Sequence, residues 1–393
     1  MSTDNTVYSI FLIFTGTAIL STLVLYTRQS LLVAYILLGM ILGPCGLKLV
    51  ADTHLITHIG EVGIIFLLFL LGLHLHPQDL WNMLRKVTLV SVISSVIFAA
   101  MGYGVGRIFG YTVTESIVIG AAMMFSSTII GLKLLPTTIL HHQHIGEVMI
   151  GILLMQDLIA IVVLLLLNTA TSGMGFTWSH TITMSLALPA LCFIAFVVER
   201  FILTKLLARF DQVQEYIFIL AIGWCLGMAH LAKIIGLSED IGAFIAGVSV
   251  AAGPIALYIA ENLKPLRDFF LVLFFFSIGA SFDFSYLSLV IIPALILGML
   301  VLLAKPYLYQ FLLRYTGERS RVGKEVGLRL GQSSEFSLLV AHMAASSSTV
   351  TLISNKTNYL IQAMTIITFI VSCYVVVLLY PTPLALTERL RRD

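Results

Sequence analysis

Long apolar runs are the feature of this sequence that most limits how the chain can fold. The first run, residues 7–26, contains no charged side chain, and a helix needs about 20 apolar residues to cross the roughly 30 Å of hydrocarbon in a bilayer. Such runs recur along all 393 residues, of which 59% are hydrophobic and 11% are charged. Soluble domains have about 25% charged residues, so we expect an integral membrane protein with the lipid bilayer as its solvent.

The runs are continuous, whereas the strands of a membrane barrel alternate between apolar and polar residues. An all-α fold is therefore predicted. Thirteen transmembrane helices satisfy the length requirement, over residues 7–26, 31–50, 59–76, 87–109, 114–138, 146–168, 181–205, 214–233, 237–253, 265–282, 286–313, 324–346 and 358–380.

The basic residues indicate how these helices are oriented. With the N-terminus outside, sixteen Lys and Arg residues fall in the cytoplasmic loops and tail, and four fall in the outer loops. Cytoplasmic loops are enriched in Lys and Arg. We therefore predict a multi-pass protein of the cell inner membrane with its N-terminus outside and its C-terminus in the cytoplasm.

The rest of the composition argues against several other classes of protein. The formal net charge is only +2, which gives no reason to expect a nucleic-acid partner. The four cysteines have no CxxC spacing, so neither a disulfide framework nor a zinc site is indicated. Because we find no nucleophile–base set, HExxH motif or P-loop, we expect neither an enzyme nor a bound cofactor.

The sequence resembles itself at an offset of 207 residues. The segment "FLLFLLGLHLHPQDL" (66–80) aligns with "LFFFSIGASFDFSYL" (273–287), and "MFSSTI" (124–129) aligns with "GQSSEF" (331–336). The fifth expected helix then corresponds to the twelfth, and because this separation is odd, the two copies are expected to have opposite orientations. Such inverted repeats are typical of secondary transporters, whose sites are formed by helices broken near the midplane.

Small polar clusters mark where these two helices are expected to break. Their hydroxyl groups can satisfy backbone groups that unwinding frees; alternatively, they only bond to the preceding turn or allow close helix packing. The clusters are Ser126, Ser127 and Thr128 in the fifth helix, and Gln332, Ser333 and Ser334 in the twelfth.

Asp157 lies in the apolar run "GILLMQDLIAIVV" (151–163) of the sixth expected helix. At 1.5 Å per residue it is roughly 16 Å from the cytoplasmic end, near the midplane. An ionised acid at that depth is costly unless it faces water, a cation or a base. We therefore predict that a proton and an alkali cation, K⁺ or Na⁺, compete for Asp157, with Gln156 offering a neutral carbonyl oxygen.

Two further charges, Lys305 and Glu335, are expected at similar depth. In one interpretation they pair with each other. In another, Lys305 pairs with Asp157, either as a purely structural pair or as one that the cation displaces. Arg329 is expected to extend its guanidinium toward the cytoplasmic side.

Six segments resemble, in chain order, the membrane domain of Kef-type potassium/proton antiporters of the second monovalent cation:proton antiporter family. They are "SSTIIGLKLLP", "GILLMQDLIAI", "GAFIAGVSVA", "LFFFSIGASFDF", "AKPYLY" and "GQSSEFSLLV". The resemblance covers nearly the whole chain, and the Gln-Asp pair is its most specific element. It implies a homodimer with a dimerisation domain and a mobile core domain that contains crossed, broken helices and moves like an elevator.

The resemblance also implies roles for individual residues and shows two departures from the family pattern. By position, it assigns the ion and proton carrier to Asp157, its polar neighbour to Gln156, the first crossing to Ser127 and Thr128, and charged core positions to Lys305 and Glu335. A Gly pair often seen in relatives is Ser333–Ser334 here. No Gly-rich βαβ segment follows the last expected span, so we do not expect the gating by nucleotide or glutathione that longer relatives show through a cytoplasmic domain, unless a regulatory domain or subunit outside this chain supplies it.

The expected spans give a domain division that follows the repeat. It consists of dimerisation-side helices in 1–86, core helices in 87–180, a linker helix in 181–213, further dimerisation-side helices in 214–285, core helices in 286–380 and a cytoplasmic tail in 381–393.

We predict from these patterns a secondary-active monovalent cation/proton antiporter, with potassium ahead of sodium. The preference rests mainly on the Gln-Asp resemblance, and one carboxylate with neutral oxygens makes a lower-field site that favours the more easily dehydrated ion. The alternatives are a Na⁺/H⁺ antiporter of the same fold, a cation channel without proton coupling and an ion-coupled symporter for an organic solute. Exchange is electroneutral if Asp157 alone carries either ion, and electrogenic if Lys305 also changes protonation.

Overall fold

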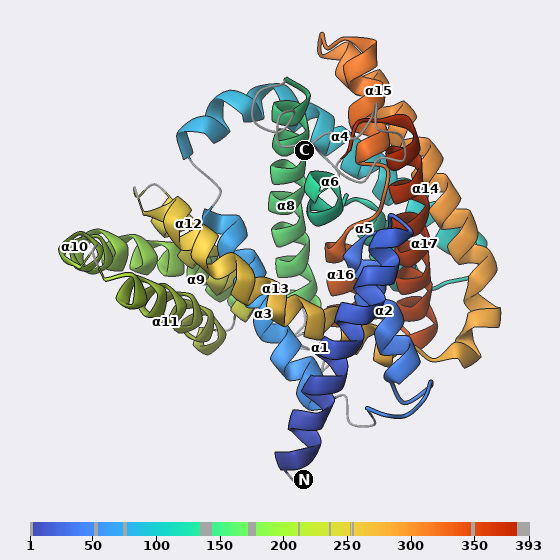
Figure 1. The fold of residues 1–393 in the computed structure, drawn as a ribbon. Coiled ribbons are helices and arrows are strands. Elements are labelled where there is room, and N and C mark those ends of the chain that lie inside the picture. Colours follow the sequence, from blue (N-terminus) through green and yellow to red (C-terminus); the bar gives the residue numbers. More distant parts are fainter. Residues whose placement is uncertain are drawn as a thin grey trace. The chain divides into compact units, whose positions relative to one another are not determined.

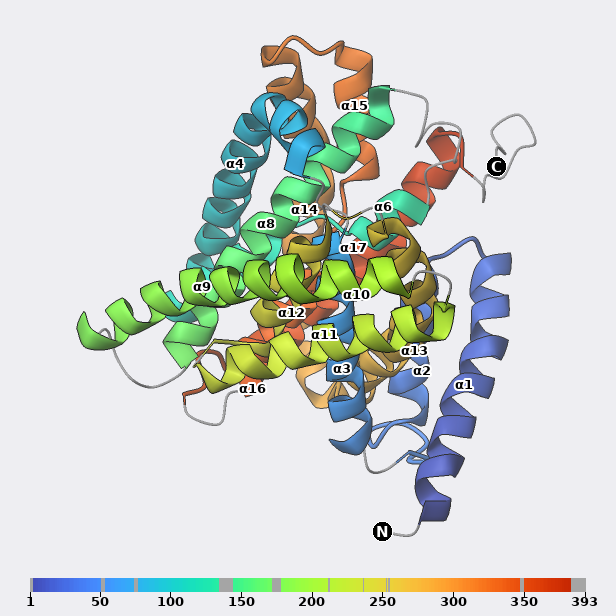
Figure 2. The ribbon, with the colours of Figure 1, turned by 90° about the vertical axis from the view of Figure 1, so that its left-hand side faces the viewer.

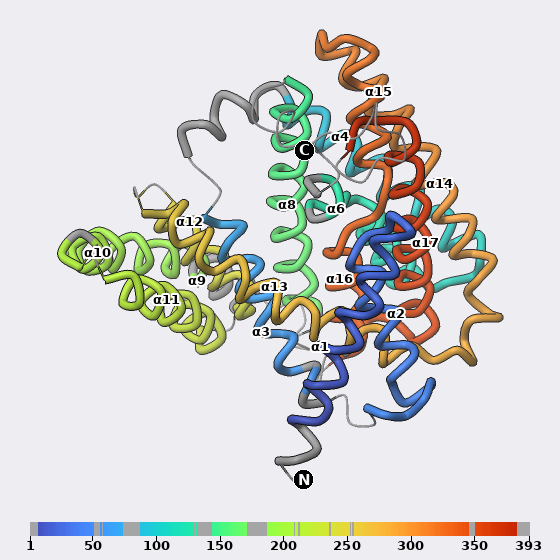
Figure 3. The backbone as a smooth tube through the Cα atoms, viewed as in Figure 1, coloured from blue at the N-terminus to red at the C-terminus, as the bar shows by residue number. Residues whose placement is uncertain are grey.

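The protein is described by a computed structural model, and Figure 3 traces its backbone. The described residues are 3–50, 54–73, 77–133, 144–171, 178–210, 213–235, 237–251, 253, 255–346 and 350–382. The chain forms two compact units. Unit 1 comprises Met1–Thr17, Tyr35–Leu80 and Met174–Ser281, and unit 2 comprises Ala18–Ala34, Trp81–Gly173 and Phe282–Asp393.

The elements of the described residues are helices. Unit 1 contains α3 (His54–Leu73), α9 (Trp178–Val198), η1 (Glu199–Leu203), α10 (Thr204–Arg209), α11 (Gln214–Ile234), α12 (Glu239–Ala251) and α13 (Ala256–Ala280). Unit 2 contains α5 (Val113–Met123), α6 (Thr128–Lys133), α8 (His144–Thr171), η2 (Phe284–Tyr286), α14 (Leu287–Tyr315), α15 (Ser320–Arg329), α16 (Glu335–Ser346) and α17 (Asn355–Leu379). The unit boundaries fall within α1 (Thr3–Tyr26), α2 (Leu31–Leu42) and α4 (Pro77–Ile108).

The all-α prediction is confirmed for these residues. Seven of the described helices are long and apolar enough to cross a membrane, and four shorter helices are also apolar. Each of the thirteen expected spans contains helix, but the number of crossings and their orientation stay predictions. The domain division also stays a prediction, and of its expected tail, residues 383–393 lie outside the described part of the chain.

Two helices have ends that differ from the expected ones. The span expected at 31–50 is helical only to Leu42, because Pro44 disfavours helical geometry at Gly43 and cannot donate a backbone bond itself. Helix α13 begins at Ala256, well before the expected residue 265, and keeps Pro265 inside. The carbonyl that loses its bond to Pro265 belongs to Glu261, which is exposed and open to solvent or headgroups.

The repeat of 207 residues extends through most of the fold. Moving α4 by this offset gives residues 284–315, the stretch that η2 and α14 cover. Moving Thr128, which begins α6, gives Glu335, which begins α16. The same offset relates α1 to α11, α2 to α12, α3 to α13, α5 to α15 and α8 to α17, and only α9 to α10 lie between the copies. The opposite orientation of the two copies stays a prediction.

Close packing in unit 1 follows the repeat as well. A side chain at Gly39 would meet the carbonyl of Phe276 and the Cα of Gly279, and one at Gly72 would meet Gly247. Gly72 and Gly279 correspond at the offset of 207, and Gly39 and Gly247 correspond at 208. The contact between α2 and α13 therefore has a counterpart between α3 and α12, and small residues permit such approaches in membrane helices.

Unit 2 is built around two broken helices. Helix α5 ends at Met123 and the chain resumes as α6 at Thr128, while α15 ends at Arg329 and resumes as α16 at Glu335. The small polar clusters that the sequence singled out lie in these breaks, except that Thr128 is the first residue of α6. Helices α5 and α16 lie side by side, and α16 also contacts α8 and α17 (Figure 1).

Helix α14 packs along both α15 and α17, and Figure 2 shows the turn that joins α14 to α15 at one end of the unit. The approach is closest at Gly327, where a side chain would meet the backbone of Pro306. This contact brings the neighbouring Lys305 of α14 beside the break that follows α15.

We expect Gly279→Ala to destabilise the protein, because its methyl group would collide with the carbonyl of Ile36 and overpacking costs about 1–3 kcal/mol. The control is Gly223→Ala in α11, where a side chain meets no atom and Ala gains up to about 1 kcal/mol of helix propensity. Melting temperatures of the purified proteins in detergent measure both. A Gly279→Ala variant as stable as Gly223→Ala would contradict the close-packing account.

Candidate functional site

The two breaks of unit 2 touch each other through their backbones. The amide of Ser127 donates to the carbonyl of Ser333 at 3.0 Å, and the Gln332 side-chain amide lies 3.5 Å from the carbonyl of Ser127. These segments, 124–127 and 331–334, correspond in the repeat. The crossing therefore joins equivalent parts of the two copies.

Hydroxyl groups satisfy several backbone groups that the breaks set free. Ser126 Oγ donates to the carbonyl of Leu330 at 2.9 Å, and Ser337 Oγ donates to that of Ala122 at 2.5 Å. The amide of Ser333 donates to Thr368 Oγ1 at 3.1 Å. Each bond connects one broken helix to another element, so the crossing is held from several sides.

The half-helices that follow the breaks are capped by the same clusters. Ser127 Oγ accepts the amide of Ile130 at 3.1 Å, and Ser334 Oγ accepts that of Phe336 at 3.2 Å. Capping of this kind satisfies helix N-terminal amides that have no partner within the helix. The backbone-satisfying interpretation of these clusters therefore describes the structure better than helix packing alone.

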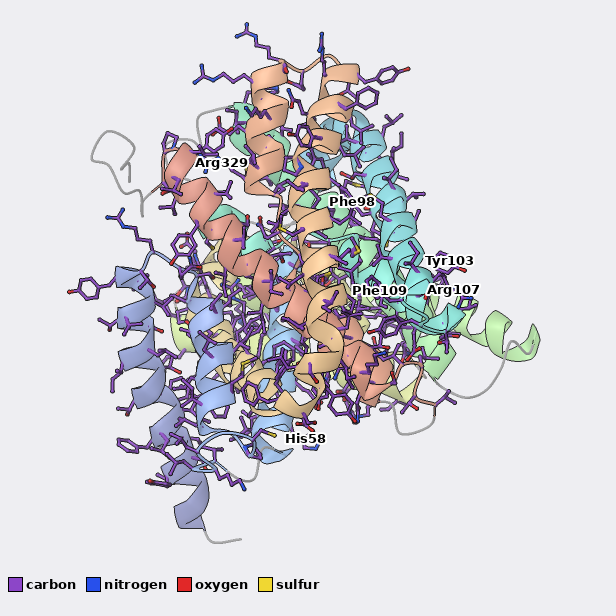
Figure 4. The ribbon with its side chains drawn as sticks, turned by 90° about the vertical axis from the view of Figure 1, so that its right-hand side faces the viewer. His58, Phe98, Tyr103, Arg107, Phe109 and Arg329 are labelled. Atoms are coloured by element: carbon purple, nitrogen blue, oxygen red, sulfur yellow. The ribbon has the colours of Figure 1, made fainter. Side chains whose placement is uncertain are left out.

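Lys305 is fully buried and binds both breaks. Its Nζ donates to the carbonyl of Phe125 at 2.6 Å, to the carbonyl of Gln332 at 2.8 Å and to Ser126 Oγ at 3.1 Å. The Phe98 ring of α4 lies 5.4 Å from the ammonium, as a cation–π contact, and Figure 4 labels Phe98 on this helix. A cation is favourable here because the carbonyl ends of two helices carry partial negative charge.

Neither ion pair expected for Lys305 is present in this structure. All three acceptors of its ammonium are carbonyl or hydroxyl oxygens, and no carboxylate of the described residues pairs with it. The expected pairs with Asp157 and Glu335 are therefore corrected to a clamp on two helix ends.

Gln156 also binds the first break. Its Oε1 accepts the amide of Ser126 at 3.0 Å, while its Nε2 donates to the carbonyl of Met124 at 3.1 Å and to Tyr309 Oη at 2.7 Å. The carbonyl oxygen expected to face a cation is thus bonded to the backbone here. A ligand role for Gln156 would require this oxygen to leave Ser126.

Asp157 is 3% exposed and has a different environment from its neighbour. Thr128 Oγ1 lies 3.4 Å from each carboxylate oxygen. Within the described residues, Asp157 has no ion pair with any Lys, Arg or His. Glu335, 4% exposed at the start of α16, is close enough for its charge to repel that of Asp157.

Glu335 lies where a helix N-terminus stabilises a negative charge. Ser334 Oγ is 3.4 Å from its Oε2. Because Thr128 begins α6 and Glu335 begins α16, the two half-helix N-termini and the two buried acids form one polar cluster. This polar cluster can hold a proton or a small cation, since carboxylate and hydroxyl oxygens are hard ligands suited to such ions.

The prediction that Arg329 extends its guanidinium toward the cytoplasmic side is wrong. This side chain is 1% exposed and binds Glu325 Oε1 through Nε and Nη2 at 3.0 and 2.9 Å. Figure 4 labels Arg329 on its helix. The spacing of four residues between Glu325 and Arg329 was the signal for this pair.

Sequence reasoning also missed Tyr309 and Glu115. Tyr309 follows Lys305 by four residues, on the same face of α14, and is fully buried. Glu115 accepts bonds from Thr112 at the start of α5 and from Ser354 and Thr357 at the start of α17. The pattern Thr-x-x-Glu is a capping box and could have indicated its first partner.

The described residues contain no group of three or more His, Cys, Asp or Glu placed to hold a metal ion together.

Comparisons with known proteins find relatives by sequence and by fold. The family described as sodium/hydrogen exchanger, transmembrane, matches residues 10–380. The ammonium/H⁺ antiporter subunit AmhT of Alkalihalophilus pseudofirmus is 30% identical over 318 residues, which cover 80% of either chain. The fold is similar to that of the sodium proton antiporter MjNhaP1 from Methanocaldococcus jannaschii at pH 8, with a TM-score of 0.71 and 16% identity, over 95% of this chain and 99% of that one.

We expect Lys305→Met to lower the stability of the protein strongly, because it leaves two buried carbonyls unsatisfied, at about 1–3 kcal/mol each. Lys324→Met, on an exposed position of α15, is the matched control and should melt like the wild type. The measurement is the melting temperature in detergent.

Asp157→Asn distinguishes two accounts of Lys305, the clamp on two helix ends and an ion pair with Asp157. If Lys305 depended on Asp157 for its charge partner, the variant would be destabilised by about 3–5 kcal/mol. The clamp instead predicts a melting temperature at or above that of the wild type, since the substitution removes a charge that Glu335 repels. A large loss of stability would contradict the account of Lys305.

Proposed function

Because this chain belongs to the sodium/hydrogen exchanger family, we propose that Asp157 binds a proton and a monovalent cation in turn and so couples their exchange. The chain is a multi-pass membrane protein and a monovalent cation/proton antiporter. The identity of the carrier, of the cation and of the moving part are the proposals that follow.

The observation that supports Asp157 as the carrier is that it is buried and that no Lys, Arg or His of the described residues pairs with it. Its carboxylate has a threonine hydroxyl as hydrogen-bond partner and a second acid nearby. An ionised acid within a membrane costs about 2.5–3.5 kcal/mol on insertion scales. A bound proton or a bound cation removes this cost, and one carboxylate favours one of them at a time.

Neighbouring oxygens complete the proposed binding site. Thr128 Oγ1 is already next to Asp157. Ser127 precedes it in the chain, but in this structure its carbonyl accepts the amide of Gly131, so Ser127 joins the site only if that bond opens. Glu335 contributes negative charge that attracts a cation and raises the cost of leaving the site empty. Gln156 joins this set only if its amide leaves the break.

Sodium is the cation we propose first. The family description and the fold neighbour both name sodium, whereas potassium rests on the resemblance of the Gln-Asp pair to Kef-type antiporters. The second acid, Glu335, makes the site more negative than a lone carboxylate, which favours the smaller ion in field-strength accounts. Ammonium, named for the relative from Alkalihalophilus pseudofirmus, is the third cation to test.

The movement and the partners are also proposals. All residues of the polar cluster belong to unit 2, so unit 2 is the part that an elevator-like mechanism would move. A homodimer is implied by the resemblance of the sequence. A regulatory subunit outside this chain is supported by the relative's description as an antiporter subunit.

Transport in proteoliposomes with an internal pH dye tests the proposal. Wild-type protein should respond to sodium, lithium, potassium and rubidium in an order that reports its selectivity, with sodium first. Asp157→Asn should lose the response to all of them, by at least about 100-fold, because its side chain can neither ionise nor exchange a proton. Ammonium is added at constant pH as a competitor of the sodium response.

The control variant is Asp283→Asn, which makes the same change outside the membrane-spanning segments. Asp283 Oδ1 accepts the amide of Ser285, and Asn keeps that acceptor. Asp283→Asn should transport at the wild-type rate. Exchange by Asp157→Asn would disprove the carrier assignment, and cation flux without a pH response would favour a channel.

We also expect one-for-one, electroneutral exchange. The ammonium of Lys305 uses all three of its N–H groups, whereas a neutral amine has only two to donate. Lys305 is therefore proposed to stay charged throughout the cycle. Solid-supported membrane electrophysiology should record no transport current after a sodium step that does change internal pH, with Asp157→Asn as baseline; a current proportional to turnover would contradict this stoichiometry.

A further inference from the structure

A buried tyrosine of α14 contacts Gln156, the neighbour of Asp157, and has no role in the exchange as described so far. Tyr309 is fully buried, and its hydroxyl accepts Gln156 Nε2 at 2.7 Å. The hydroxyls of Ser94 and Ser126 are also its neighbours. Its ring is packed edge-on against Phe98, with 5.9 Å between centroids.

The backbone of the first break determines which way the Gln156 amide faces, and Tyr309 holds the amide there by accepting its second N–H. The amide has an oxygen that accepts and a nitrogen that donates, and a 180° turn exchanges them. In the structure the nitrogen is shared by Met124 O and Tyr309 Oη, and the oxygen takes the amide of Ser126. A turned amide would place its NH₂ group against the Ser126 N–H and its oxygen against the carbonyl of Met124.

The orientation of Gln156 fixes the segment that carries Thr128. Its bonds hold Met124 and Ser126, and Thr128 follows two residues later with its hydroxyl 3.4 Å from Asp157. Gln156 and Asp157 are consecutive in α8. Gln156 therefore positions the segment that carries Thr128, and Thr128 contacts Asp157, the next residue of α8.

We propose that Tyr309 is a positioning residue that acts through Gln156 and sets the geometry between Thr128 and Asp157. The inference rests on the proposed role of Asp157 as carrier. It concerns cation affinity rather than the capacity for exchange, because Tyr309 touches neither the carboxylate nor the hydroxyl of Thr128.

Tyr309→Phe tests the proposal because it removes one oxygen and keeps the ring packed against Phe98. The expected result is a KM for sodium about three- to tenfold higher, the range of one net hydrogen bond, with the maximal rate within about twofold of the wild type. The control is Tyr111→Phe, because Tyr111 is another buried tyrosine of unit 2 and its hydroxyl has no hydrogen-bond partner among the described residues. Tyr111→Phe should leave the KM unchanged.

Gln156→Leu distinguishes action through Gln156 from a direct effect. In this background no amide remains to be oriented, so adding Tyr309→Phe should change the KM by less than about twofold. An additive effect of the two substitutions would overturn the proposal, as would a Tyr309→Phe variant with the wild-type KM.

Hydrogen–deuterium exchange provides a readout that does not need transport. Peptides that contain residues 124–128 should exchange faster in Tyr309→Phe than in Tyr111→Phe, because the bond to the Ser126 amide is weakened. Equal exchange in the two variants would overturn the proposal. If Asp157→Asn still transports, the carrier assignment fails independently of this result.

Discussion

The structure of unit 2 depends on one constraint: a broken helix in lipid must still find hydrogen-bond partners for its backbone N–H and C=O groups. Water does not reach such groups within the hydrocarbon, and each unsatisfied one costs several kcal/mol. Two breaks that face each other share the solution: a hydroxyl of one break bonds the carbonyl of the other, and the amide of Ser127 bonds Ser333. Lys305 completes this arrangement because a single ammonium can serve both helix ends at once.

This arrangement leaves Asp157 without a basic partner among the described residues. The charge of Lys305 is stabilised by carbonyl dipoles, and Arg329 is paired with Glu325 four residues away. Gln156 is used by the backbone of the first break. Asp157 alone among these residues has a hydroxyl partner and a repelling neighbour instead of a base, and an acid in that state retains affinity for any small cation that reaches it.

Sequence patterns predicted the helices and both breaks, because apolar length and clustered hydroxyls are local properties. They also located Asp157 and Gln156 on one helix. The partners of Lys305 could not be predicted, since its acceptors are two carbonyls 27 and 180 residues away and every residue has a carbonyl. Side-chain charge suggested carboxylates instead. Arg329 was misplaced for a different reason: its charge was expected to face the cytoplasmic side, although Glu325 at a spacing of four was visible in the sequence.

The repeat explains why the two halves need different residues at equivalent positions. At the offset of 207, Lys305 corresponds to Phe98, Thr128 to Glu335 and Asp157 to Met364. Two lysines would place two ammonium groups at one crossing, whereas Lys305 with the Phe98 ring beside it gives one charge and a favourable cation–π contact. Likewise, acids at Thr128 and Met364 as well as at Asp157 and Glu335 would give four like charges, which repel one another more than two do. A symmetric backbone therefore holds an asymmetric set of side chains, with one clamp and two acids, and this asymmetry keeps the charge at the crossing small enough for a single monovalent ion to balance.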